Sequence, residues 1–147
     1  MKNATAFWDA SGLVPLCVHE AASHRAQSHL KKFSPVVWWG SFVEVHSALC
    51  RLHRDQQISD QEKKGAVARL SLLSRGWREI LPSDQIREWA AQSLDEYSLR
   101  AAESMQLAAS LMWCERRPEK KLFICGHHRL ARAARSEKFS VLELPLV

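Results

Sequence analysis

Three carboxylates and one histidine occupy positions from which they could act on a common ligand. Asp9 directly follows an apolar run, and Glu44 lies in the first turn of an expected helix. Glu103 lies within a long expected helix, and His127 follows another apolar run with one residue between. Mg²⁺ and Mn²⁺ prefer oxygen ligands, and a bound ion polarises a phosphoryl oxygen and lowers the pKa of an attacking water. These residues are therefore candidates for metal-assisted hydrolysis of phosphodiester bonds.

Each of these residues also has a purely structural explanation. Asp9 could cap the turn that follows it, and residues 41–44 (Ser-Phe-Val-Glu) match a capping box that would use Glu44 at the helix start. Glu103 could pair with Arg100 or point to solvent, and His127 could simply begin a helix. A cap and a metal ligand are compatible, because a carboxylate has two oxygen atoms. The functional hypothesis therefore requires that the side chains converge in the fold.

Short apolar runs and helical repeats alternate along the chain. Strands are expected at residues 4–8, 36–39, 80–81, 122–125 and 141–144, where apolar runs are bounded by Gly, Pro or polar residues. Helical spacing and capping signals predict a short turn at 14–18, helices at 20–32, 42–54, 99–113 and 127–135, and two more after Ser59 and Ser83. This alternation predicts an α/β sandwich, with a short parallel sheet and helices on both faces.

The length and this pattern predict a single domain over residues 1–147, without an internal repeat or a linker. In an open parallel sheet, ligands bind beyond the carboxyl ends of the strands. Asp9, Glu44 and His127 follow three such ends, so we expect their side chains to meet at one edge of the sheet. Glu103 joins them only if the long helix packs nearby.

The positive charge of the chain is concentrated in one stretch. The formal net charge is +5, and residues 115–138 contain eight basic and three acidic side chains, which accounts for the whole excess. Basic clusters attract nucleic acids because binding releases counterions from the phosphates; a solvated surface that favours solubility would have the same composition. The candidate RNA-binding residues are Arg116, Arg117, Lys120, Lys121, Arg129 and Arg132.

Other features exclude several classes of protein. No apolar run approaches the roughly 20 residues of a membrane helix, and the first residues do not resemble a secretory signal. The four cysteines contain no CxxC pair, which favours buried thiols in a reducing compartment over a zinc site. We therefore expect a cytoplasmic protein with no membrane partner.

Four segments, in order, resemble the motifs of PIN-domain nucleases, and most closely those of the toxin subunits of VapBC-type toxin–antitoxin pairs. They are residues 7–16 (FWDASGLVPL), 41–49 (SFVEVHSAL), 99–109 (LRAAESMQLAA) and 123–134 (FICGHHRLARAA). The resemblance covers nearly the whole chain. It implies a PIN-like three-layer sandwich and an Mg²⁺- or Mn²⁺-dependent endoribonuclease. Asp9, Glu44 and Glu103 would be its catalytic, metal-binding acids, with Ser11 supporting Asp9. It also implies a homodimer and a small antitoxin that inserts a segment into the acidic groove.

Two positions depart from the family pattern. Glu103 stands where the third acid is normally Asp, and His127 stands where the fourth motif normally has Asp. The main hypothesis is a divalent-metal-dependent RNase with His127 as a peripheral ligand or a phosphate contact. The alternative is a catalytically degenerate PIN domain that acts by binding a protein partner or RNA. A phospho-acceptor receiver domain fits less well. Such a domain needs paired acids before the first helix that follows a strand and a lysine after a strand late in the chain, and the sequence has neither.

Overall fold

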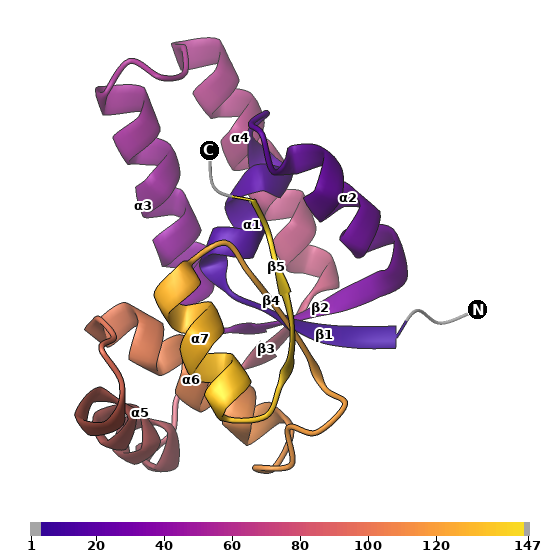
Figure 1. Ribbon diagram of the computed structural model, residues 1–147. Helices are drawn as coiled ribbons and strands as arrows, with labels where there is room; N and C mark the ends of the chain where they lie inside the picture. The colour runs from indigo at the N-terminus through magenta and orange to yellow at the C-terminus, as the bar shows by residue number, and fades with distance from the viewer. Residues whose placement is uncertain (1–3, 146–147) are drawn as a thin grey trace.

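The structure is a computed structural model that describes residues 4–145, and its centre is a five-stranded sheet (Figure 1). The strands are β1 Ala4–Trp8, β2 Phe33–Trp38, β3 Arg78–Ile80, β4 Leu122–Cys125 and β5 Ser140–Glu143. They pair in the order β3-β2-β1-β4-β5, and every pairing is parallel. The expected parallel sheet is therefore confirmed. Residues 1–3 and 146–147 of the expected domain lie outside the described part.

Seven helices in the described residues cover both faces of the sheet. They are α1 Ala10–Cys17, α2 Ser23–Lys32, α3 Ser41–Arg54, α4 Asp60–Gly76, α5 Asp84–Glu96, α6 Ala101–Trp113 and α7 His128–Ser136. The first four pack on one face and the last three on the other (Figure 1). The predicted three-layer architecture is confirmed. None of the helices within residues 4–145 is long and apolar enough to cross a lipid bilayer.

Several boundaries differ from the sequence-based expectation: α2 begins at Ser23 instead of residue 20, β3 is Arg78–Ile80 instead of 80–81, and the starts of α1 and β2 also differ. α1 begins at Ala10 rather than as a short turn at residue 14, because Asp9 accepts the backbone N–H of Ser11 and starts the helix directly after β1. β2 begins at Phe33 rather than residue 36, and Pro35 lies within it opposite Ala6. Ser34 and Pro35, which lie between the helix expected at 20–32 and the strand expected at 36–39, are thus part of the strand.

Each face of the sheet has its own apolar core. Ala6 and Trp8 of β1 pack with α1–α4, whereas Phe7 between them packs with α5–α7. This alternation follows from the twofold period of side chains along a strand. Because β1 is central and covered on both sides, its last three residues are fully buried.

Truncation of Leu49 in α3 tests how much the core between the sheet and α1–α4 contributes to the stability of the fold. The Leu49 side chain is fully buried in that core, so Leu49→Ala is expected to lower the free energy of unfolding by about 2–5 kcal/mol. Leu72→Ala on α4 is the matched control, because Leu72 is 67% exposed and its truncation should change stability by less than about 0.5 kcal/mol. Urea denaturation measures both. Equal losses in the two variants would contradict this packing.

Parallel pairing brings the carboxyl ends of the central strands together. Trp8 lies opposite Ile124, and the backbone N–H of Asp9 donates to the carbonyl of Ile124 at 2.9 Å. The first residues after β1 and β4 are therefore neighbours in space, although more than a hundred residues separate them in the chain.

Candidate active site

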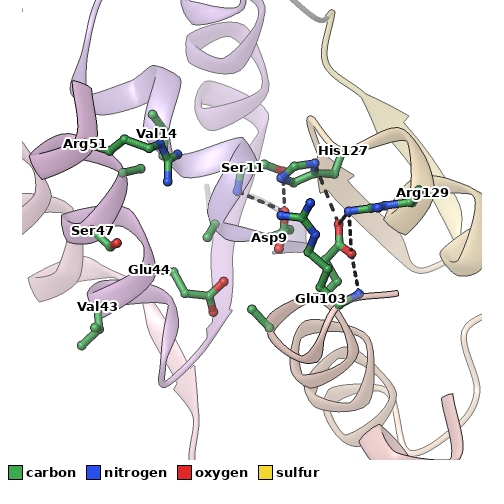
Figure 2. Close-up of a pocket in the computed structure, with 14 residues that line it drawn as sticks. Asp9, Ser11, Val14, Val43, Glu44, Ser47, Arg51, Glu103, His127 and Arg129 are labelled. Carbon is green, nitrogen blue, oxygen red and sulfur yellow. Dashed lines mark hydrogen bonds and ion pairs between the residues drawn. The ribbon is translucent and has the colours of Figure 1, made fainter. Parts of the chain in front are cut away.

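The five residues predicted to form or support the site line one cleft of about 450 Å³ (Figure 2). They are Asp9, Ser11, Glu44, Glu103 and His127. Each lies at the amino-terminal end of a helix: α1, α3, α6 or α7. Figure 2 shows Glu44 on one side of the cleft, Glu103 with His127 on the other, and Asp9 between them. The convergence inferred from the fold class is confirmed.

Asp9 lies at the bottom of the cleft and is both a helix cap and a cleft residue. Its side chain is nearly fully buried, and its Oδ2 accepts the backbone N–H of Ser11 at 3.0 Å and the Ser11 hydroxyl. Burial raises the pKa of Asp9 above its usual value, although the Ser11 hydrogen bonds oppose the shift. The same carboxylate therefore caps α1 and lines the cleft.

Ser11 links the ends of two strands. While its hydroxyl donates to Asp9, the same oxygen accepts the backbone N–H of Gly126 at 2.7 Å. A Cβ atom at Gly126 would lie 3.3 Å from the Ser11 carbonyl oxygen, so glycine permits this close approach. Ser11 thus fixes Asp9 relative to the segment that carries His127, which agrees with the supporting role expected for it.

Glu44 does not form the capping box that its sequence context suggests. α3 begins at Ser41 without a side-chain cap, and the Glu44 Oε2 accepts a hydrogen bond from Gln106 Nε2 of α6 at 3.0 Å. The Glu44 carboxylate is therefore turned toward α6 instead of its own helix end. Burial, followed by repulsion from Asp9, raises the pKa of Glu44 to about 7.

Glu103 is held by neighbours on three sides. Its Oε1 accepts the backbone N–H of Arg100 at 2.8 Å, and Arg129 Nη2 lies 3.3 Å from Oε1 and 3.4 Å from Oε2. His127 Nδ1 lies 3.9 Å from Oε2. The cationic partner of Glu103 is thus Arg129, instead of the Arg100 side chain proposed from the sequence.

Gln106 is a site residue that the sequence reasoning did not assign. It is fully buried, and its Nε2 donates to Ser41 Oγ at 2.9 Å as well as to Glu44. Its Oε1 has no hydrogen-bond partner. The available signal was its spacing, because Gln106 lies one turn after Glu103 on an otherwise apolar helix. Arg51 and Arg100, which also line the cleft, gave no such signal.

The predicted basic surface is divided between the two ends of the sheet. Arg116, Arg117, Lys120 and Lys121 lie in the segment before β4, at the amino ends of the strands, whereas the cleft lies at the carboxyl ends. Two of them lie over tryptophan rings: Arg116 over Trp89 at 4.7 Å and Lys121 over Trp113 at 5.8 Å. Of the six candidates, Arg129 alone lines the cleft, and Arg132 shares an adjoining 260 Å³ hollow with it.

The oxygen donors of Asp9 and Glu44, which line the same cleft, are of the kind that a hard divalent cation prefers. Neither carboxylate lies within 4 Å of a basic side-chain nitrogen in residues 4–145. Burial is the main cause of the raised pKa of each, and repulsion from Asp9 adds to the shift at Glu44. Hard cations are commonly bound by one or two carboxylates together with water. Among the described residues, no three His, Cys, Asp or Glu side chains are arranged to bind a metal directly, and Glu103 as a third metal ligand remains a prediction.

Gln106→Met tests whether the buried amide positions Glu44. The substitution keeps the length of the side chain and removes its donors, so we expect Mn²⁺ to bind about 10- to 100-fold more weakly, as for other partners of metal ligands. Ser110→Ala is the control, because the buried Ser110 hydroxyl donates only within α6, to the Leu107 carbonyl. Isothermal calorimetry measures both affinities. Equal affinities for Gln106→Met and the parent would exclude the positioning role.

Solved structures with a similar fold come from toxin–antitoxin complexes. The chain is similar to one in a toxin–antitoxin complex from Klebsiella pneumoniae, with a TM-score of 0.57, 17% identity and coverage of 86% of this chain and 91% of that chain. It is also similar to a chain of VapBC2 from Rickettsia felis, solved bound to a DNA fragment from their promoter, with a TM-score of 0.63, 7% identity and coverage of 95% and 98%. No protein-family model and no curated protein matches the sequence. The chain therefore has the PIN-like α/β fold expected from its motifs, which is also the fold of these chains from toxin–antitoxin complexes.

Proposed function

We propose that this protein is the toxin of a VapBC-type toxin–antitoxin pair and that it hydrolyses RNA with the help of Mg²⁺ or Mn²⁺. The observation that carries the proposal is the cleft itself. Asp9 and Glu44 lie there at the carboxyl ends of the strands, with no basic side-chain nitrogen of the described residues within 4 Å, and Glu103 lies across from them. The similarity in fold to chains of toxin–antitoxin complexes supports the same conclusion.

In this proposal, some residues of the cleft bind the metal ion and others bind the RNA. Asp9 and Glu44 would hold the cation, which when bound would polarise a phosphoryl oxygen and lower the pKa of a water molecule. Ser11 and Gln106 keep these two carboxylates in place through hydrogen bonds. The three arginines of the cleft (Arg51, Arg100 and Arg129) are suited to bind RNA phosphates, because a guanidinium pairs with phosphate through several donors.

A small antitoxin and a second copy of the chain are the expected protein partners. Both follow from the resemblance to VapBC toxins, and the similarity to chains of toxin–antitoxin complexes supports the first. Light scattering of the purified protein measures whether two copies associate, and we expect twice the mass of one chain.

RNA cleavage with controlled metal content tests the activity. The purified protein is incubated with a mixed RNA substrate after treatment with EDTA, and Mg²⁺ or Mn²⁺ is then restored. We expect no cleavage with EDTA and cleavage after either ion returns. Cleavage that persists in EDTA, or its absence with both ions, would contradict the proposed function.

The ion pair between Arg129 and Glu103 favours a second candidate. A PIN domain in which an arginine neutralises one acid, and in which His127 replaces another, could bind RNA or a protein without hydrolysis. Calorimetric titration with Mn²⁺ separates the two functions, because the binding-only protein would give no saturable heat at the cleft.

A further inference from the structure

The three acids of the cleft differ in their electrostatic surroundings. Figure 2 shows the contacts of Glu103 with Arg129 and His127 on one side, and Glu44 apart from them on the other. Within residues 4–145, Glu103 is the one acid of the cleft that lies within 4 Å of basic side-chain nitrogens. The half of the cleft around Glu103 therefore contains an ion pair within 4 Å, and the half around Asp9 and Glu44 does not.

On the Glu103 side of the cleft, both oxygens of this carboxylate already have partners. Oε1 accepts the Arg100 backbone N–H and faces Arg129, while Oε2 faces Arg129 and His127. The side chain of Glu103 is 9% exposed and that of Arg129 is 48% exposed, so the carboxylate is shielded while solvent screens the guanidinium in part. A cation at Glu103 would compete with a guanidinium that is already in contact.

On the other side, the hydrogen-bond partners of Asp9 and Glu44 are neutral, and the imidazole of His127 acts on Asp9 from beyond 4 Å. Asp9 accepts hydrogen bonds from Ser11, and Glu44 accepts one from Gln106. Neutral donors orient a carboxylate and leave its charge in place. Two such carboxylates in one cleft repel each other, and a divalent ion would relieve that repulsion.

The geometry points to a site for a single divalent ion, held by Asp9 and Glu44, in which the guanidinium of Arg129 neutralises Glu103 in place of a further cation. This inference rests on the proposed metal-dependent function and refines it. Two-metal phosphodiesterases require enough carboxylates for both ions. Here Arg129 supplies a positive group at the side of the cleft where a second ion would need acids.

Arg129 also has donors left for the substrate. Its contacts with Glu103 use Nη2, and its side chain is 48% exposed at the junction of the cleft and the neighbouring hollow that contains Arg132. A guanidinium has five N–H donors, so the remaining ones can bind an RNA phosphate. Arg129 therefore acts as a fixed positive charge that faces both Glu103 and the substrate.

Counting bound ions tests the inference. Mn²⁺ is titrated into the full-length parent protein by calorimetry, and electron paramagnetic resonance measures the free ion. We expect one Mn²⁺ per chain. Glu103→Gln keeps an acceptor for the Arg100 N–H and should change the dissociation constant by less than about 3-fold, whereas Glu44→Gln should raise it at least about 10-fold.

Arg129 variants complete the experiment. Arg129→Met leaves Glu103 without its guanidinium, so the number of bound Mn²⁺ ions should rise from one toward two, whereas Arg129→Lys keeps the charge and should leave it at one. Circular dichroism confirms that each variant is folded.

Three results would overturn the inference alone: two ions in the parent, equal weakening by Glu103→Gln and Glu44→Gln, or a single ion in Arg129→Met. The absence of Mn²⁺ binding in the parent would instead overturn the proposed function, on which the inference depends.

Discussion

Asp9→Asn is expected to reduce RNA cleavage by more than about 100-fold without loss of the fold. Loss of a partner of a metal ligand already costs about 10- to 100-fold, and loss of a charged ligand should exceed this. Asn keeps the shape of the side chain and an oxygen that can accept the Ser11 N–H. Because burial raises the pKa of Asp9, the charge costs stability, so its removal should not lower the melting temperature.

Asp84→Asn is the matched control for this experiment. Asp84 begins α5, and its side chain is 98% exposed, so the variant has the same chemical change outside the cleft. Initial rates on a fluorescent RNA measure all three proteins. If Asp9→Asn cleaved at the parent rate, the activity would have to come from another site or from a contaminant.

Glu44→Gln is expected to make the metal-free protein more stable at pH 8 and to leave its stability at pH 4 almost unchanged. Folded Glu44 keeps its proton up to about pH 7, whereas the unfolded chain releases it near pH 4.5. Between these values the folded state binds more protons, so the stability of the parent falls as the pH rises. The shift corresponds to roughly 3 kcal/mol for a shielded group, and screening by solvent reduces this to about 1–2 kcal/mol.

Mn²⁺ should reverse the order of stability at pH 8. Binding to the folded parent adds stability in proportion to the logarithm of the ion concentration over the dissociation constant, and Glu44→Gln should gain less because it binds the ion poorly. Urea denaturation with EDTA and with Mn²⁺ measures both effects. Glu88→Gln on the exposed surface of α5 should follow the parent in each condition. A Glu44→Gln variant no more stable than the parent at pH 8 in EDTA would contradict the pKa assignment.

Much of the fold was predictable because its signals are local. The capping box of Ser59 and Glu62 forms as expected, with hydrogen bonds of 2.9 and 3.1 Å, and Ser83 caps α5. Apolar runs located all five strands of the described region. The meeting of Asp9 with His127 followed from parallel pairing, because strand ends in such a sheet share one edge.

The partners of the acids could not be predicted, since they depend on how helices pack. Gln106 reaches Glu44 across 62 residues, and this contact replaced the local capping box that the sequence favoured. Likewise, Arg129 reaches Glu103 from a helix 26 residues further along the chain. The basic residues 115–138 also do not form one surface. Arg116 lies between α6 and β4, at the end of the sheet opposite the cleft, whereas Arg129 lines the cleft.

The placement of the cleft at the start of four helices has a consequence for the protein without metal. Each helix begins with unpaired N–H groups that are equivalent to about half a positive charge, and α1, α3, α6 and α7 all begin at the cleft. Backbone dipoles thus offset part of the mutual repulsion of the acids before any ion arrives. The cleft therefore forms without a bound ion. Removing the metal with a chelator should abolish RNA cleavage without unfolding the protein, whereas a zinc finger unfolds when its ion is removed.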